Sequence, residues 1–232
     1  MATIRMAHVA TGFKRRLWGG WLQLRFRLFQ RHRYDRLALE TIGGKPFVVL
    51  PQVFNPGLFD TSRLLARALS ARLLPPGSTV LDMGTGSGIA AVFAAQWAGR
   101  IVAVDINPAA VRCARINALL NQVEDRVEVL QGDLFEPVRG RRFDVVLFNP
   151  PFYRGAPRDA LDRAWRSTDT VERFAAELRQ YLTPAGRAII VLSTQGETPA
   201  FMSAFQSNGL TVETLLERDL VSEVVTLYRL AP

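Results

Sequence analysis

Two clusters of residues in this 232-residue chain have types and spacings that could do chemistry, and both follow apolar runs. The first is the glycine-rich stretch 82–88, Asp-Met-Gly-Thr-Gly-Ser-Gly. Glycine permits a tight turn and lets backbone N–H groups approach a ligand closely. Asp105 ends the next apolar run, where a carboxylate can accept hydrogen bonds from both hydroxyls of a ribose. Together these residues predict a site for a ribose-bearing ligand, and an ordinary strand-to-helix turn is the alternative.

The second cluster is Asn149-Pro150-Pro151-Phe152, which follows the apolar run 143–148. The Asn149 side-chain oxygen and the Pro150 carbonyl can both accept hydrogen bonds from one planar amino group, and neither proline has an N–H that competes. Two acceptors aim the nitrogen and stabilise positive charge developing on it. Phe152 offers a flat face on which an amide or base can stack. The alternative interpretation is a proline-rich turn after a strand.

The spacing of the glycines distinguishes two kinds of cofactor. A dinucleotide fingerprint has the pattern G-x-G-x-x-G, but Ile89 occupies its third glycine position here. The actual pattern is G-x-G-x-G, with Asp82 two residues before the first glycine. This pattern resembles the first motif of class I S-adenosylmethionine (SAM) methyltransferases.

The resemblance implies SAM as cofactor and S-adenosyl-L-homocysteine as product. The glycine loop would hold the methionine end of SAM, Asp105 the ribose, and Ile106 would pack on the adenine. The stretch 132–135, Gly-Asp-Leu-Phe, resembles the family's contact with the adenine edge. No metal is expected. The implied cofactor-binding residues are Asp82, Gly84, Thr85, Gly86, Gly88, Asp105, Ile106, Asp133, Leu134 and Asn149.

The second cluster resembles the Asn-Pro-Pro-aromatic motif of methyltransferases that act on amino groups. These include release-factor glutamine methyltransferases and small-domain RNA methyltransferases that modify exocyclic amines of adenine or guanine. The resemblance implies that an amino or amide nitrogen attacks the SAM methyl group directly. The implied catalytic residues are Asn149, Pro150 and Phe152, and the implied substrate-binding residues are Pro151, Tyr153 and Arg154.

Three classes of methyl acceptor follow. Protein glutamine ranks first, because segments 44–49 and 53–56 with Thr61 resemble the hairpin and proline loop of the glutamine enzymes. Ser62 departs from that family, which usually has glutamate there. An RNA exocyclic amine ranks second, supported by a basic N-terminal arm, and a small-molecule amine ranks third. The alternative to an enzyme is an RNA-binding protein that has the methyltransferase fold but does not catalyse a reaction.

Strands and helices that alternate along the chain must position these residues. Such alternation predicts a mostly parallel sheet with helices on both faces. Ahead of it, a hairpin at 37–54 turns at 43–44, and a helix runs to about Leu73, capped by Thr61 or Ser62. Strands are expected at 79–82, 101–105, 127–130, 143–148, 188–192, 211–216 and 221–230, and helices at 88–98, 108–122, 171–182 and 199–207.

The predicted fold class is therefore α/β: a seven-stranded Rossmann-like class I methyltransferase sheet with an antiparallel last strand pair. We expect three parts, a basic amphipathic arm at 1–36, a β-hairpin and loop at 37–60, and the SAM-dependent methyltransferase domain at 61–232. Trp165 is interpreted either as a wall of the substrate site or as a core residue, and the core is favoured. Arg154 and Arg158 either hold an anionic group or pair with Asp159 and Asp162.

Composition excludes several classes of protein. The chain is 48% hydrophobic and 22% charged, which excludes a disordered chain. One cysteine and two histidines argue against a disulfide and a Cys/His zinc site, and predict a cytoplasmic, metal-independent protein. No uncharged run reaches the roughly 18 residues that a membrane span needs. Arginine outnumbers lysine 27 to 2, which favours a bacterial source with a GC-rich genome.

The charge is concentrated at the N-terminus. Residues 1–36 hold nine basic side chains and one acidic side chain, and the remaining residues are balanced. The arm is interpreted either as a binder of RNA phosphates or an acidic partner, or as a lid whose aromatic side packs on the main domain. The lid is favoured because charge runs are usually solvated faces. An amphipathic membrane contact is the third alternative.

Overall fold

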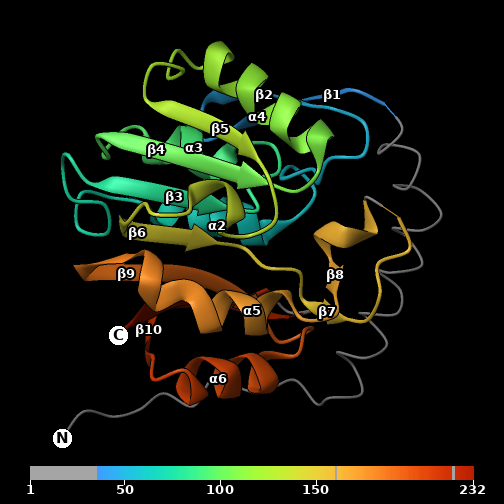
Figure 1. Cartoon of the computed structure of the whole chain (residues 1–232). Coiled ribbons are helices and arrows are strands. Elements are labelled where there is room, and N and C mark those ends of the chain that lie inside the picture. Colours follow the sequence, from blue (N-terminus) through green and yellow to red (C-terminus); the bar gives the residue numbers. More distant parts are fainter. Residues whose placement is uncertain (1–35, 160, 221–222) are drawn as a thin grey trace, which may run out of the picture.

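The protein folds around a seven-stranded sheet with helices on both faces (Figure 1). The computed structural model describes residues 36–159, 161–220 and 223–232, so the basic arm lies outside the described residues except for Arg36. The strands of the large sheet are β3 (Thr79–Met83), β4 (Arg100–Asp105), β5 (Val127–Gln131), β6 (Phe143–Phe148), β9 (Leu182–Ser193), β10 (Thr211–Asp219) and β11 (Val224–Ala231).

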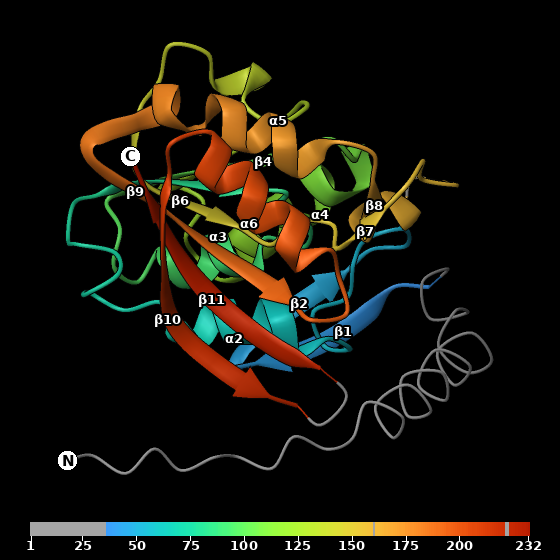
Figure 2. The same cartoon turned by 90° about the horizontal axis from the view of Figure 1, so that it is seen from below.

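The order of the strands is β10-β11-β9-β6-β3-β4-β5. The five strands from β9 to β5 are parallel, while β11 runs antiparallel to β9 and β10 antiparallel to β11. Figure 2 shows this antiparallel pair at one edge of the sheet. The strand order reverses direction at β3, so the carboxyl ends of β3, β4 and β6 meet where open α/β sheets bind ligands. The predicted fold class is confirmed.

Two hydrophobic clusters cover the two faces of the sheet. One contains buried residues of α2, α3 and α4, and the other contains buried residues of α5 and α6. Adjacent strand residues such as Val80 and Leu81 belong to opposite clusters, which is why the parallel strands are continuous apolar runs in the sequence. The helices are α2 (Asp60–Ala68), α3 (Ile89–Ala94), α4 (Pro108–Leu120), α5 (Thr170–Glu177) and α6 (Thr198–Ser207).

A hairpin of β1 (Ala38–Ile42) and β2 (Lys45–Val49) precedes the large sheet, as predicted, with Gly43 and Gly44 at its turn. Asn117 of α4 is fully buried and ties the hairpin to the domain. Its side chain accepts a hydrogen bond from the Val48 amide (2.8 Å) and donates to the Val48 and Ser87 carbonyls (2.7 and 2.8 Å). The hairpin is therefore bonded to the glycine-rich segment through one amide side chain.

Three local predictions were wrong. Helix α2 ends at Ala68 rather than near Leu73, and its N-cap residue is Phe59 without a side-chain cap, so neither Thr61 nor Ser62 caps it. Leu182 begins β9 instead of ending a helix, because it pairs with Phe143 in the sheet. Sheet pairing overrides local helix preference at such a position. The sequence analysis also missed two short strands, β7 (Tyr153–Arg154) and β8 (Arg166–Ser167), which pair in parallel.

Candidate functional site

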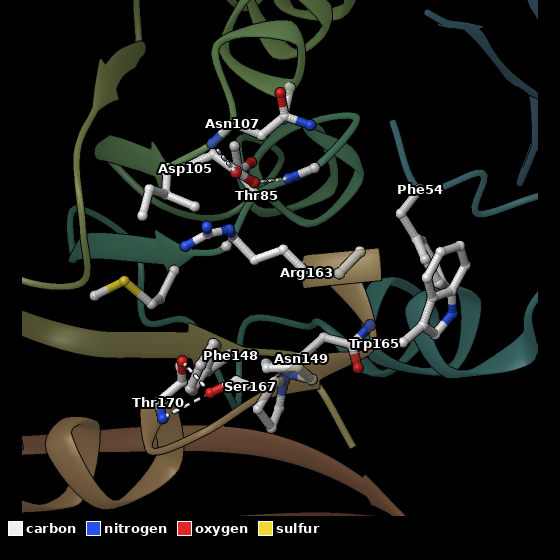
Figure 3. Close-up of a pocket in the computed structure, with 18 of the residues that line it drawn as sticks. Phe54, Thr85, Asp105, Asn107, Phe148, Asn149, Arg163, Trp165, Ser167 and Thr170 are labelled. Atoms are coloured by element: carbon white, nitrogen blue, oxygen red, sulfur yellow. Dashed lines mark hydrogen bonds between the residues drawn. The ribbon is translucent and has the colours of Figure 1, made fainter. Parts of the chain in front are cut away.

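A cavity of about 320 Å³ lies at the carboxyl ends of β3, β4 and β6, within the size range of small-molecule sites. Both predicted clusters line it. In Figure 3 Thr85 and Asp105 lie on one side of this cavity and Phe148 and Asn149 on the other. The fold therefore brings together two motifs that are more than 60 residues apart in the sequence.

The glycine loop after β3 needs glycine for two different reasons. Gly86 has a φ of +57°, and a Cβ there would meet no atom within 4 Å, so the backbone faces open space. Gly88 has a φ of +80°, and a Cβ there would lie 3.0 Å from the Ala114 Cα. Gly88 does not line the cavity, so it serves the packing of the loop on α4.

Asp82 holds this loop in place through two hydrogen bonds. It is buried, and its Oδ2 accepts hydrogen bonds from the Thr85 hydroxyl (2.6 Å) and the Ala91 amide (3.1 Å). Burial raises the pKa of the Asp82 carboxyl to about 7, although the hydrogen bonds from Thr85 and Ala91 oppose this shift. Asp82 therefore links the loop to the first residues of α3.

Asp105 at the end of β4 faces the same loop (Figure 3). Its Oδ2 accepts from the Gly86 amide (2.8 Å) and its Oδ1 from the Asn107 amide (2.9 Å). Burial raises the pKa of this carboxyl as well. Ile106 lines the cavity and is 37% exposed. The carboxylate and the apolar side chain thus lie next to each other on the cavity wall.

Asp133 and Leu134 line the cavity after β5. Asp133 pairs with Arg173 of α5 at 2.8 Å, and Leu134 is buried with a φ of +47°. A leucine rarely adopts this left-handed conformation, and such strain concentrates at functional sites. The turn therefore places an apolar side chain and a carboxylate together at one end of the cavity.

The Asn149 side chain at the end of β6 is bonded at only one of its two ends. Its Nδ2 donates to the Ser62 hydroxyl at 3.0 Å. Its Oδ1 is buried and has no hydrogen-bond partner among the described residues. Buried polar atoms in native proteins are nearly always paired, so an unpaired acceptor in a cavity indicates a site for a donor group.

The residues after Asn149 also belong to the cavity wall. Pro150, Pro151, Phe152 and Tyr153 line it, whereas Arg154 does not and instead forms an ion pair with Glu172. The predicted pairing of Arg154 with Asp159 or Asp162 is absent from the described residues, where Asp162 pairs with Arg166. The structure therefore brings every predicted site residue to the cavity except Gly88 and Arg154.

Trp165 is not a core residue, which corrects the sequence interpretation. The β7–β8 pairing returns the chain to the cavity, and the Tyr153 amide donates to the Trp165 carbonyl at 2.8 Å. The half-buried Trp165 ring lies 5.6 Å from Phe54 and 6.0 Å from Phe59, and the two phenylalanines are stacked at 4.8 Å. We call Phe54, Phe59 and Trp165 the aromatic wall. In Figure 3 Phe54 and Trp165 lie at the Asn149 end of the cavity.

Sequence reasoning missed four contributors to this site: Ser62, Phe54, Phe59 and Arg163. Arg163 extends from the short 3₁₀ turn Asp162–Ala164 into the cavity (Figure 3). Within the described part of the chain it forms no ion pair, while Arg166 and Arg173 of the same cavity are paired. These residues lie outside the two chemical motifs, and only the tertiary fold brings them to Asn149.

A family model described as the methyltransferase small domain matches residues 45–215. The chain belongs to this family. The domain is therefore a class I SAM-dependent methyltransferase, and the sequence resemblance is confirmed at this level. Across residues 36–159, 161–220 and 223–232, we find no group of side chains that could hold a metal ion and no helix long and apolar enough to cross a membrane.

Relatives of this methyltransferase domain act on different acceptors. The ribosomal RNA small subunit methyltransferase C of Alcanivorax borkumensis is 36% identical over 60% of this chain and 40% of its own length. The release factor glutamine methyltransferase of Geobacter sulfurreducens is 31% identical over 75% of this chain and 64% of its own. The chain thus spans less than two thirds of these relatives.

A solved structure extends the comparison to bound ligands. A 16S rRNA N2 methyltransferase of T. thermophilus, in complex with AdoMet and guanosine, has a TM-score of 0.64 and 25% identity. The match covers 83% of this chain and 49% of that one. In the methyltransferase domain here, the open backbone at Gly86, the Asp105 carboxylate and the exposed Ile106 lie on one cavity.

Proposed function

We propose that this methyltransferase domain methylates the nitrogen of a planar amino group held against Asn149. The observation that carries the proposal is the buried, unpartnered Oδ1 of Asn149 in the cavity that the glycine loop also lines. An unpaired buried acceptor costs free energy, so its persistence favours a ligand that donates to it. An amino nitrogen donates two hydrogens and therefore suits two adjacent acceptors.

The residues before β6 would hold the cofactor, which supplies the methyl group on a sulfonium. We assign its methionine part to Gly84, Thr85 and Gly86, and its ribose to the Asp105 carboxylate. Ile106 and Leu134 supply apolar faces for the adenine ring, and Asp133 supplies an acceptor at its edge. Asp82 acts indirectly in this proposal, because its hydrogen bonds hold the loop on α3.

Asn149 and Pro150 would orient the acceptor nitrogen. Hydrogen bonds from the amino group to the Asn149 Oδ1 and the Pro150 carbonyl fix its plane and stabilise positive charge that develops on it. Phe152 lines the same cavity and packs partly on the core, so its ring has a fixed place beside the acceptor. Pro151 and Tyr153 complete this wall.

The aromatic wall leads us to rank a nucleobase exocyclic amine first among the acceptors. Three rings whose centres lie 4.8 to 6.0 Å apart line the cavity, an aromatic wall that suits a base better than it suits a glutamine side chain. Stacking of bases on aromatic side chains is the usual way in which proteins bind unpaired bases. The relative named as a ribosomal RNA methyltransferase and the guanosine in the solved neighbour support this ranking.

Protein glutamine is the second candidate. The release factor glutamine methyltransferase relative matches 75% of this chain. The hairpin β1–β2 is also present, and its sequence resembles that of the hairpin in the glutamine enzymes. The primary amide of glutamine also presents a planar amino group, so the Asn149 geometry suits it equally. The aromatic wall is therefore the feature that favours a nucleobase over glutamine.

The decisive experiment incubates the full chain with SAM that carries a labelled methyl group. Three acceptor preparations from cells that lack the gene are compared: total RNA, purified release factor and the small-molecule fraction. Label in RNA, recovered as an N-methylated base after digestion, is the expected result. Label in the release factor would favour the glutamine candidate, and label only in small molecules would exclude both. If SAM binds but no preparation takes up label, the proposed function is wrong.

A further inference from the structure

Ser62 makes the one hydrogen bond that the structure shows to the Asn149 amide among the described residues. The serine is 7% exposed and lies in the first turn of α2, 87 residues before Asn149. We propose that Ser62 is a positioning residue, which fixes the Asn149 amide so that its oxygen faces the methyl acceptor. The inference rests on the proposed function of Asn149 and adds a residue that lies outside both the glycine-rich stretch and the Asn-Pro-Pro-Phe cluster.

The two ends of an asparagine side chain have almost the same shape but opposite hydrogen-bonding character. The oxygen accepts, and the NH₂ group donates. Only the oxygen end attracts an amino group, because the NH₂ end would bring two donors face to face. Ser62 accepts from Nδ2, and the Oδ1 then has no partner among the described residues. The bond to Ser62 thus holds the NH₂ end of the amide at α2 and leaves its oxygen for the acceptor.

The serine itself has a firm support. Leu65 and Ala66, one turn further along α2, are each 2% exposed and belong to the cluster that packs α2 on α3. Among the described residues, the hydrogen bond that the structure shows for the Ser62 hydroxyl is to Asn149 and not to its own helix. Its bond to Asn149 therefore joins a rigidly packed helix to the end of β6.

Removal of the hydroxyl would free the amide to rotate. In Ser62→Ala the Nδ2 loses its acceptor, so the amide is no longer held in the orientation that the structure shows, and turnover falls while the walls of the cavity stay in place. We expect kcat to fall about tenfold, with little change in acceptor KM or in SAM affinity. Ser62→Thr keeps a hydroxyl at this position and is expected to restore most of the turnover.

Ser78 offers a matched control. It is 6% exposed, and its hydroxyl has no partner among the described residues. It directly precedes β3 and so lies at the amino ends of the parallel strands, whereas Asn149 lies at their carboxyl ends. Ser78→Ala removes the same atom from a buried site and is expected to leave kcat unchanged. The probes are total RNA and purified release factor from cells that lack the gene, with methyl-labelled SAM.

Two further measurements separate positioning from a general structural effect. In an Asn149→Ala background, Ser62→Ala is expected to cause no further loss of kcat, because the group that it positions is gone. The side-chain NH₂ signals of Asn149 in ¹⁵N–¹H spectra, assigned by their loss in Asn149→Ala, should shift in Ser62→Ala and not in Ser78→Ala. This second measurement needs no acceptor.

The possible failures are distinguishable. If Ser62→Ala turns over normally while Asn149→Ala does not, or if the Asn149 NH₂ signals do not move, the positioning role is overturned. An additive loss in the double variant overturns it as well. If Asn149→Ala itself turns over normally, the proposed function fails, and the NH₂ signals still show whether Ser62 holds the amide.

Discussion

The backbone amide of Glu197 donates to the carbonyl of Phe152 across 3.2 Å. This bond ties the acceptor motif to the segment that follows β9. Between these two segments there is no room for a side chain, because a Cβ on Gly196 would lie 2.7 Å from the Phe152 carbonyl oxygen. The motif is therefore held at both ends, at Asn149 by α2 and at Phe152 by the turn before α6.

The first prediction follows from this close approach. Gly196→Ala places a methyl group against the Phe152 backbone and should push Phe152 away, at a cost of about 1–3 kcal/mol in stability. Because Phe152 lines the acceptor side of the cavity, we expect acceptor KM to rise while SAM affinity is retained. Kinetics with labelled SAM and binding calorimetry measure the two quantities.

Gly99→Ala is the matched control for this variant. Gly99 lies just before β4, at the end of that strand away from the cavity. A Cβ there would lie 3.0 Å from the Gly77 backbone. It should lower the melting temperature without changing acceptor KM. Equal effects of the two variants on acceptor KM would contradict the specific role of the Gly196 contact.

The second prediction concerns the acceptor of the proposed hydrogen bond. Asn149→Ala removes Oδ1 and should reduce kcat about a hundredfold, the typical effect of deleting one group that stabilises developing charge. Affinity for SAM should remain, because Asp105 and the glycine loop are untouched. Asn121→Ala, at the end of α4, removes an amide that donates to the Pro46 carbonyl (2.9 Å) and serves as control. Normal turnover in Asn149→Ala would refute the assignment.

The third prediction tests the aromatic wall. Trp165→Ala removes the ring that contacts both Phe54 and Phe59 and should raise acceptor KM about tenfold if a nucleobase stacks there. Trp97→Ala is the control, because Trp97 lies after α3, is 38% exposed and does not line the cavity. Steady-state kinetics with RNA and with release factor should show the effect for RNA. A rise confined to release factor would favour glutamine as the acceptor.

The fourth prediction is a pH dependence. Burial raises the pKa of Asp82 from 3.8 to about 7, so the folded chain keeps a proton that the unfolded chain releases between these values. Stability from this group is therefore complete below about pH 4 and is lost as pH rises to about 7. The side chain in Asp82→Asn cannot ionise. The melting temperature of the variant minus that of the parent chain should therefore increase over this pH range and stay constant above it.

Thermal melts without cofactor, from about pH 4 to about pH 8, measure this difference. Asp125→Asn makes the same chemical change at a side chain that is 78% exposed and is the control. A difference between Asp82→Asn and the parent chain that stays constant with pH would show that Asp82 keeps an ordinary pKa.

The parallel core and its ligand edge were predictable because their signals are local. Each buried strand is a largely apolar run, and a polar or glycine residue directly follows β3 and β6 and ends β4. The rule that ligands bind at the carboxyl ends of such strands then places Asp105 and Asn149 together without any knowledge of side-chain contacts. This is why the two motifs could be assigned to one cavity from their order in the chain.

The acceptor side was not predictable in the same way. Ser62 was interpreted as a helix cap, a local role, but its partner is 87 residues away. For Trp165 the core was favoured over a wall of the substrate site, and an aromatic residue in an irregular segment carries no periodic signal that separates the two. Its place depends on the β7–β8 pairing, two strands of two residues each, which are too short to leave an alternating pattern.

The last prediction uses the basic arm to separate the acceptor classes. Residues 1–36 carry nine basic side chains and one acidic side chain, while the rest of the chain is balanced, so deleting them removes the net positive charge. If RNA is the acceptor and the arm contacts its phosphates, the deletion should raise KM for RNA and flatten the rise of KM with salt, since each lost phosphate contact lowers the salt slope by about 0.7 to 0.9. A chain with the arm retained but Arg15, Arg16, Arg25 and Arg27 changed to glutamine is the matched variant, because it keeps the apolar residues. A steep salt dependence in both variants would assign RNA binding to the described domain, and an unchanged KM for release factor would show that catalysis itself does not need the arm.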